Sequence, residues 1–364
     1  MKRLIQSLLG IGVSVLAVWL TFRGKDLGAI WRAVQDGDYR YLPVYLGSLG
    51  VIHLLRTVRW GILLEPVVKV PFARLNAVSA VGFTALLILP FRLGEFARPY
   101  LIAERPKLRV SAALSSGVVE RVADGIFTAL LLLVTLFAVP EGTPHLGEIR
   151  KAGFVMAALF GGLLAFLVVA YVSRELAVRL VKRLLGSLSP RFAEHAAGML
   201  DAFIRGLRLV PSKRKMALFL LLTAAYWSLN GWGMHLMARA FALDIQLIDA
   251  YTILGVLVAG VMIPAGPGMV GTFQLACAFG LSLFVPEAVA HTRGVAWANV
   301  IWASQVGFQL VLGTVFLFSS HIKVARIFRS PEGTVEALDD EEAEAIAREH
   351  GGAVPGPGGP PAGA

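Results

Sequence analysis

The feature that most constrains this chain is a series of long stretches without any charged residue. Crossing a bilayer as a helix takes about 20 predominantly apolar residues. Four uncharged stretches have about this length, namely residues 4–22, 152–172, 216–238 and 295–320. Residues 41–64 and 122–139 are similarly apolar but carry Arg56, Arg59 and Asp124. The sequence therefore predicts six membrane-spanning helices.

The composition excludes a soluble domain. Hydrophobic residues make up 56% of the 364 positions and charged residues only 16%, whereas soluble domains have about 25% charged residues. The single cysteine, Cys277, rules out a disulfide framework. The chain contains neither an HExxH motif, nor a P-loop, nor a recognisable nucleophile–base set. We therefore expect no enzyme activity, no cofactor and no metal site.

Two further apolar stretches are interrupted by proline and glycine. Residues 75–90 and 250–263 are uncharged but short, and each is followed by a break and a second short piece, residues 96–103 and 270–285. Such short runs are typical of re-entrant segments. We expect two re-entrant helical hairpins, with full crossings (eight or more spans in all) as the alternative. The breaks contain Pro90 and Gly94 in the first hairpin, and Pro264, Gly266, Pro267, Gly268 and Gly271 in the second.

The order of these elements repeats. Residues 4–139 and residues 152–318 both run span, span, hairpin, span, and they begin on opposite sides of the membrane. Short segments interrupted by glycine and proline, placed alike in two opposed halves, are the sequence pattern of an inverted-repeat transporter. The binding site of such a fold lies where the two hairpins meet. The sequence predicts an all-α polytopic membrane domain over residues 1–320.

Loop charge predicts the orientation. Residues 173–215 carry ten Lys or Arg and three acids, which makes this amphipathic connector cytoplasmic by the positive-inside rule. The parity of the spans then places both termini in the cytoplasm. The formal net charge of +10 is expected to orient loops and attract lipid headgroups rather than nucleic acid. Residues 331–364 form an acidic, then Gly- and Pro-rich tail that we expect to be disordered.

Ionisable residues gather at the first break and in the following span. Six lie within 33 positions: Arg92, Glu95, Arg98, Glu120, Arg121 and Asp124. Two readings are open for this cluster: guanidinium groups that bind a phosphate oxyanion bidentately, or a static ion-pair network. Arg56 and Arg59 lie roughly 12 and 8 Å from the inner end of their span. They either reach the headgroups by snorkelling or belong to the site.

The second break matches a dinucleotide-binding pattern by coincidence. Gly266, Gly268 and Gly271 have the spacing of the G-x-G-x-x-G fingerprint. That fingerprint needs a preceding strand within a βαβ unit, whereas apolar helix flanks this match. The glycines are better explained by the hairpin turn.

The motifs Arg92-x-Gly94-Glu95-x-x-Arg98, Glu120-Arg121-x-x-Asp124 and Pro267-Gly268-x-x-Gly271 resemble one family. It is the lysylphosphatidylglycerol synthase transmembrane-region family of flippase-like proteins, similar to the membrane half of the multiple peptide resistance factor. The resemblance covers residues 4–320. Relatives commonly have a glutamate where this chain has Gln274. The aminoacyl-transferring domain of the namesake is not expected in the short segment after His321.

The resemblance implies a multi-pass protein of the bacterial cytoplasmic membrane that moves lipids between leaflets. Its expected partners are membrane lipids, either an anionic phospholipid or a polyprenyl-phosphate-linked substrate, and a homo-oligomer stays open. A secondary transporter of a small soluble anion is the first alternative. A non-transporting scaffold that binds partners through its basic loop or acidic tail is the second.

Overall fold

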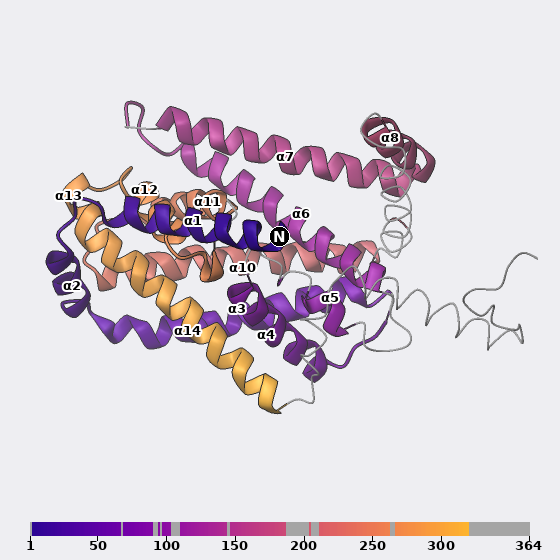
Figure 1. Ribbon diagram of the computed structural model, residues 1–364, viewed down its shortest axis with the longest axis horizontal. Coiled ribbons are helices and arrows are strands. Elements are labelled where there is room, and N and C mark those ends of the chain that lie inside the picture. The colour runs from indigo at the N-terminus through magenta and orange to yellow at the C-terminus, as the bar shows by residue number, and fades with distance from the viewer. Residues whose placement is uncertain are drawn as a thin grey trace, which may run out of the picture. The chain divides into compact units, whose positions relative to one another are not determined.

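A computed structural model describes residues 2–66, 68–89, 94, 97–102, 110–143, 146–186, 204, 211–262 and 266–319. Within these ranges the chain forms helices and connecting turns and no strand (Figure 1). The prediction of an all-α protein is thereby confirmed. The acidic tail lies outside the described residues, as do Pro90, Arg92, Glu95 and Pro264.

All six predicted spans are helical. They correspond to α1 (Lys2–Phe22), α3 (Leu42–Leu64), α6 (Val110–Leu136), α7 (Leu146–Val172), α10 (Lys213–Ala240) and α14 (Val295–Ser319). Three helical segments in the described part are long and apolar enough to cross a membrane, namely Tyr39–Leu64, Leu146–Val172 and Glu287–Ser319. The chain is thus a polytopic membrane protein, and the count of six spans stays a prediction.

Both interrupted stretches fold back on themselves. α4 (Phe72–Ile88) packs against α5 (Ala97–Ile102), and α11 (Leu247–Val261) packs against α12 (Thr272–Leu281). α4 and α11 have 17 and 15 residues, so each is shorter than a typical span. The hairpin shape agrees with the sequence prediction, whereas re-entry into a membrane stays a prediction.

The second break is held by helices from both ends of the chain. The 3₁₀ turn Pro267–Met269 contains Gly268 at φ +67°. The indole N–H of Trp302 in α14 donates to the Gly268 carbonyl at 2.8 Å, and the Gly266 N–H donates to Ser14 Oγ in α1 at 2.9 Å. Backbone groups that a helix break frees within a membrane must be satisfied by protein, and α1 and α14 provide those partners.

The first break depends on a close approach of backbone to backbone. A Cβ atom added at Gly94 would lie 2.1 Å from the Leu86 nitrogen and 2.3 Å from the Ala85 carbonyl carbon. Only glycine fits such a contact without moving the main chain. Gly94 therefore permits the chain to pass tightly over the last turn of α4.

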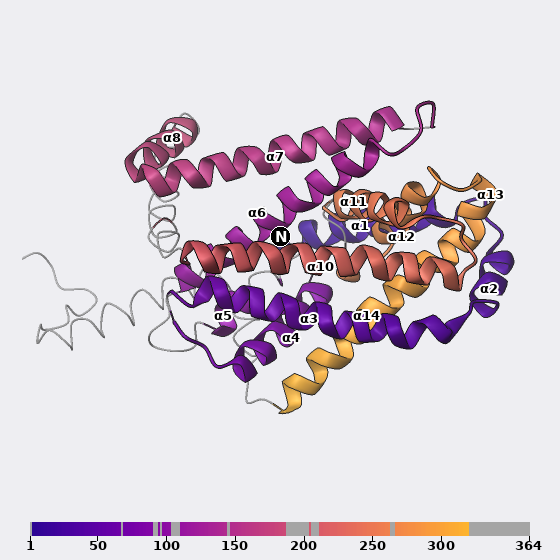
Figure 2. The ribbon, with the colours of Figure 1, turned by 180° about the vertical axis from the view of Figure 1, so that it is seen from behind.

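Helices α3 and α10 form an antiparallel pair at the centre of the described part (Figure 2). An ion pair between Glu65 and Lys215 joins the pair at one end. At the other end the Asp38 N–H donates to the Ala240 carbonyl at 2.8 Å. The apolar core beside this pair includes the fully buried Trp297. Because both ends are tied, α3 and α10 present fixed faces to the helices around them.

The remaining helices pack around this pair in a regular pattern. α3 contacts α4, and likewise α10 contacts α11. α14 lies against α4, and likewise α6 lies against α11. α5 contacts α6, α12 contacts α14, and both α6 and α14 contact α3 and α10. The first helix of each half departs from this pattern, because α1 packs on α12 and α7 packs on α6.

Short helices connect these elements. α2 (Leu27–Gln35) and the 3₁₀ turn Tyr39–Tyr41 precede α3, and α13 (Glu287–Val289) leads through the π-helical turn Ala290–Gly294 into α14. α8 (Arg174–Gly186) forms the first part of the basic connector. Between α8 and residue 211, only Ile204 belongs to the described residues.

Candidate functional site

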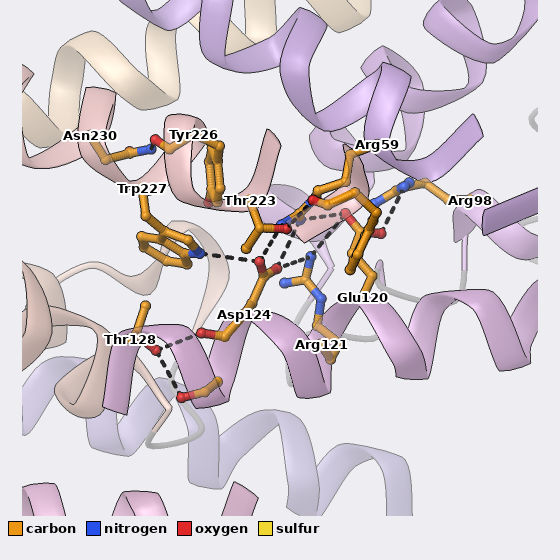
Figure 3. Close-up of polar contacts among 12 residues, drawn as sticks. Arg59, Arg98, Glu120, Arg121, Asp124, Thr128, Thr223, Tyr226, Trp227 and Asn230 are labelled. Atoms are coloured by element: carbon orange, nitrogen blue, oxygen red, sulfur yellow. Dashed lines mark hydrogen bonds and ion pairs between the residues drawn. The ribbon is translucent and has the colours of Figure 1, made fainter. Parts of the chain in front are cut away.

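The site is built around the guanidinium group of Arg59 on α3. Its Nη2 donates to Glu120 Oε1 at 2.8 Å and to Asp124 Oδ2 at 3.0 Å (Figure 3). Glu120 and Asp124 are one helical turn apart on α6, so both carboxylates point to the same side. Arg59 has no exposed surface and Glu120 is 1% exposed. The three side chains thus form a buried ion-pair cluster between α3 and α6.

α10 contributes two neutral partners to this cluster. Thr223 Oγ1 accepts a hydrogen bond from Arg59 Nη1 at 3.2 Å, and the indole N–H of Trp227 donates to Asp124 Oδ1 at 3.1 Å (Figure 3). Thr223 itself donates to the Phe219 carbonyl at 2.8 Å. Buried charges persist when their remaining hydrogen-bonding capacity is filled, and α10 fills part of that capacity here.

The first hairpin adds Arg98 from α5. Its Nη2 lies 3.1 Å from Glu120 Oε2. Its guanidinium carbon lies 4.2 Å from the ring centroid of Trp60 and 4.5 Å from that of Phe83. A cation between aromatic faces gains attraction from both rings. Arg98 therefore fastens α5 to α3, α4 and α6 through a single side chain.

Arg56 and Arg121 differ from these inner arginines. Arg121 Nη2 is 3.4 Å from Asp124 Oδ2, and the Arg121 side chain is 33% exposed. Arg56 stacks on Phe83 with its guanidinium carbon 3.5 Å from the ring centroid. No carboxylate in the described part pairs with Arg56. The described part of the cluster therefore holds four guanidinium groups, those of Arg56, Arg59, Arg98 and Arg121. It holds two carboxylates, those of Glu120 and Asp124.

A cavity of about 420 Å³ adjoins the cluster. Arg56, Arg121 and Asp124 line it, together with the side chains of Tyr226 and Trp227. Most of the remaining wall is apolar and comes from α4, α11, α14 and the second break. This central cavity therefore combines an apolar wall from both halves with a small cationic region.

A smaller cavity of about 170 Å³ lies on the other side of Arg121. Arg98, Glu120 and Gly94 line it, whereas Phe83 and Arg121 border both cavities. Arg121 and Phe83 thus stand between the tightly packed first hairpin and the central cavity.

The structure brings together most of the residues singled out in the sequence. Arg59, Arg98, Glu120, Arg121 and Asp124 form the connected cluster, with Arg56 beside it. Snorkelling does not apply to Arg59, because its side chain is fully buried between helices. In the second break, Gly268 lines the central cavity. Gly266, Pro267 and Gly271 shape the turn that holds it.

Sequence reasoning missed the contribution of α10. Thr223 and Trp227 are four positions apart in an uncharged span and therefore share one helical face. That spacing was the available signal, since both side chains can hydrogen bond within an apolar helix. Trp60 and Phe83 were missed for a different reason, because an aromatic residue in an apolar span gives no sign of a cation above its ring.

Gln274 has a structural function. Its Oε1 accepts the Gly271 N–H at 2.8 Å, and its side chain is buried at the start of α12. An amide oxygen can accept this hydrogen bond as a carboxylate would. The bond also occupies one of the N–H groups that an anion could otherwise use at this helix start.

The family of the chain follows from its match to a family model. The model of the lysylphosphatidylglycerol synthase TM region matches residues 7–313. The chain belongs to this family. The matched residues of this lysylphosphatidylglycerol synthase TM-region protein include the whole charged cluster and both hairpins, and the family connects the membrane domain with lipids. No curated protein and no solved structure matches the chain.

Proposed function

We propose that the protein moves a lipid with an anionic headgroup between the leaflets of the bacterial cytoplasmic membrane. The observation that carries this proposal is the Arg56 guanidinium group at the central cavity, which stacks on Phe83 and pairs with no carboxylate in the described part of the chain. A buried positive charge without a partner is costly within a membrane. An anionic ligand that visits the cavity would offset that cost.

The arginines divide into two groups with different tasks. Arg59 and Arg98 are buried and do not line the central cavity, so they support the site. Arg56 and Arg121 line the cavity. A guanidinium group binds a phosphate through two parallel N–H donors, so we propose that these two hold the headgroup phosphate.

The size of the cavity favours a headgroup over a whole lipid. About 420 Å³ is at the small end of ligand pockets, and its apolar wall continues along α11 and α14. The lipid tails would then stay in the bilayer while the headgroup enters. An anionic phospholipid and a polyprenyl-phosphate-linked substrate share the required phosphate.

The helix contacts support an inverted repeat as the framework for movement. In the two halves, α3, α4, α5 and α6 correspond to α10, α11, α12 and α14. When each helix is replaced by its counterpart, the α3–α4 contact becomes α10–α11 and the α4–α14 contact becomes α11–α6. In the same way, α5–α6 becomes α12–α14 and α6–α10 becomes α14–α3. All of these contacts are present, and the α3–α10 contact maps onto itself. In inverted-repeat transporters one repeat rocks against the other around a site between them, and the central cavity has such a position.

Reconstitution tests the function directly. Vesicles that contain the purified protein and a fluorescent anionic phospholipid should expose the inner-leaflet probe to an external quencher faster than protein-free vesicles do. Uptake of labelled inorganic phosphate by the same vesicles would instead favour a small-anion transporter. If neither process exceeds the protein-free rate, transport is contradicted and a scaffold becomes the better account. The proposal involves no chemical change of the lipid.

A further inference from the structure

A third cavity lies at the end of the α3–α10 pair opposite Glu65 and Lys215. It has a volume of about 360 Å³ and is enclosed by α2, the C-terminal end of α10 and the π-helical turn before α14. Its polar wall consists of Arg32, Asp36, Thr292 and Arg293. Ala240 on this wall is 13 positions after Trp227, which is about 20 Å along α10. This α2 cavity is therefore separate from the central one.

The two arginines of the α2 cavity have little to bind within the protein. Arg293 forms no ion pair or hydrogen bond with any residue that the structure describes. Arg32 has one ion pair with Asp26 at 3.6 Å, in which both side chains are 67% exposed. An exposed pair of this kind contributes little. Both guanidinium groups are therefore available to an anion.

The backbone beside Arg293 has an unusual form. Residues Ala290–Gly294 make a π-helical turn, and such turns occur frequently at functional sites. The turn contacts α2, and both Thr292 and Arg293 line the cavity. The charges on this wall are two guanidinium groups and the Asp36 carboxylate. Their net value of one positive charge matches a single phosphodiester.

Two large apolar side chains stand exposed on the helix that bounds the cavity. Leu27 and Trp31 are 61% and 62% exposed and one helical turn apart, so they share one face of α2. Ile30, on another face, is buried in the core. Tryptophan is enriched where a membrane protein meets the headgroup layer. This face lies opposite the one that lines the cavity (Ala29, Arg32, Ala33 and Asp36), so the apolar pair places α2 at the level of the headgroups without contacting the cavity itself.

We propose that the α2 cavity binds the phosphate group of a phospholipid. Arg32 and Arg293 receive the phosphate, while Leu27 and Trp31 on the opposite face hold α2 at the headgroup layer. A cavity at the level of the headgroups is surrounded by lipid phosphates, which favours the lipid over free phosphate as the ligand. This site lies on the side predicted to face away from the cytoplasm, and it goes beyond the headgroup site proposed at Arg56 and Arg121.

A fluorescent reporter on α2 tests this assignment. Gln35 is exposed on the same helix and does not line the cavity, so Gln35→Cys can carry an environment-sensitive dye. The native Cys277 is buried, which leaves position 35 as the reactive thiol. Titrating the full-length protein in detergent with phosphatidylglycerol of six-carbon chains should give a saturable change in fluorescence. Arg293→Gln should weaken the apparent affinity about tenfold, since one charge-assisted hydrogen bond is lost.

Matched variants separate the possible origins of the signal. Arg40→Gln removes a cation at the same end, but Arg40 pairs with Asp38 at 2.7 Å and lies outside the cavity, so lipid affinity should stay unchanged. Arg121→Gln alters the central and the smaller cavity but not the α2 cavity, so it should also leave this titration unchanged, whatever it does to lipid transfer.

Three results would overturn the proposal. They are the absence of a saturable response, equal affinity of wild type and Arg293→Gln for the lipid, and inorganic phosphate binding as tightly as the lipid. The first two exclude a phosphate site at the α2 cavity, and the third assigns it to a soluble anion. Arg293 and Arg32 are exposed, and the melting temperature of each variant shows that it folds.

Discussion

Arg59 and Asp124 are 65 positions apart in the chain, yet the two nitrogens at the tip of Arg59 face the two oxygens of Asp124. Nη1 donates to Oδ1 and Nη2 to Oδ2. The same guanidinium group also reaches Glu120, and Asp124 also accepts the indole N–H of Trp227. One side-chain pair therefore connects α3, α6 and α10 at the base of the central cavity.

Arg59→Met should destabilise the protein severely. The change leaves Glu120 and Asp124 close together with less compensating charge, and breaking a buried ion pair on one side costs about 3–5 kcal/mol. The melting temperature of the detergent-purified protein measures the loss. Arg150→Gln breaks the more exposed pair with Glu141 and a long hydrogen bond of 3.4 Å to the Leu136 carbonyl, and it should cost less than about 1 kcal/mol. Equal melting temperatures for the two variants would contradict the supporting role of Arg59.

Gly94→Ala should prevent the first hairpin from closing. The added methyl group would meet the backbone at Ala85 and Leu86, and neither atom can turn away as a side chain could. We expect a strong loss of folded protein, measured as the monodisperse fraction in size-exclusion chromatography. Gly161→Ala in α7 is the control, because nothing lies within 4 Å of its Cβ position. A normal yield of Gly94→Ala would show that the hairpin has a looser path.

The cap on α12 predicts an asymmetry between two substitutions. Gln274→Leu removes the acceptor of the Gly271 N–H and should lower stability by about 1–3 kcal/mol, the cost of an unsatisfied buried donor. Gln274→Glu keeps an oxygen in place and should fold. The two melting temperatures, recorded at the same pH, decide the point. A larger loss for the glutamate variant would show that the charge, and not the missing acceptor, governs this position.

The Glu65–Lys215 pair predicts a dependence of stability on pH. The hydrogen bond from the Lys215 ammonium group holds the pKa of Glu65 below its usual value near 4.5. A carboxyl whose pKa is lowered by folding stabilises the protein above its unfolded pKa, and this contribution disappears as the pH falls through the folded pKa. Wild type should therefore melt slightly above Glu65→Gln at pH 7, with the gap closing below about pH 4. A gap that persists at pH 3 would assign the effect to something other than this charge.

Much of the helical framework could be predicted from the sequence. Uncharged length located α1, α7 and α14, and the prolines and glycines after α4 and α11 located both hairpins. The spacing of Arg121 and Asp124 is itself enough to indicate their contact, because i,i+3 neighbours on a helix meet. These inferences succeeded because each depends on local chain geometry or on the thickness of a bilayer.

The partners across helices could not be predicted in the same way. The depth of Arg59 in its span left both snorkelling and membership of the site open, whereas the structure buries it against Glu120, 61 positions away. Which face of α3 meets α6 depends on how all the helices pack, and no local pattern carries that information. Trp227 joins the cluster for the same reason, from a third helix.

The most direct test of the account is the rate of lipid transfer in vesicles that contain Arg121→Lys or Arg56→Lys. Both variants keep the charge but lose the planar pair of donors that binds a phosphate on two sides. The account predicts a melting temperature close to that of wild type and a transfer rate at least tenfold lower for Arg121→Lys, with Arg40→Lys as the unaffected control. Transfer at the wild-type rate by both lysine variants would contradict the claim that Arg56 and Arg121 hold the headgroup.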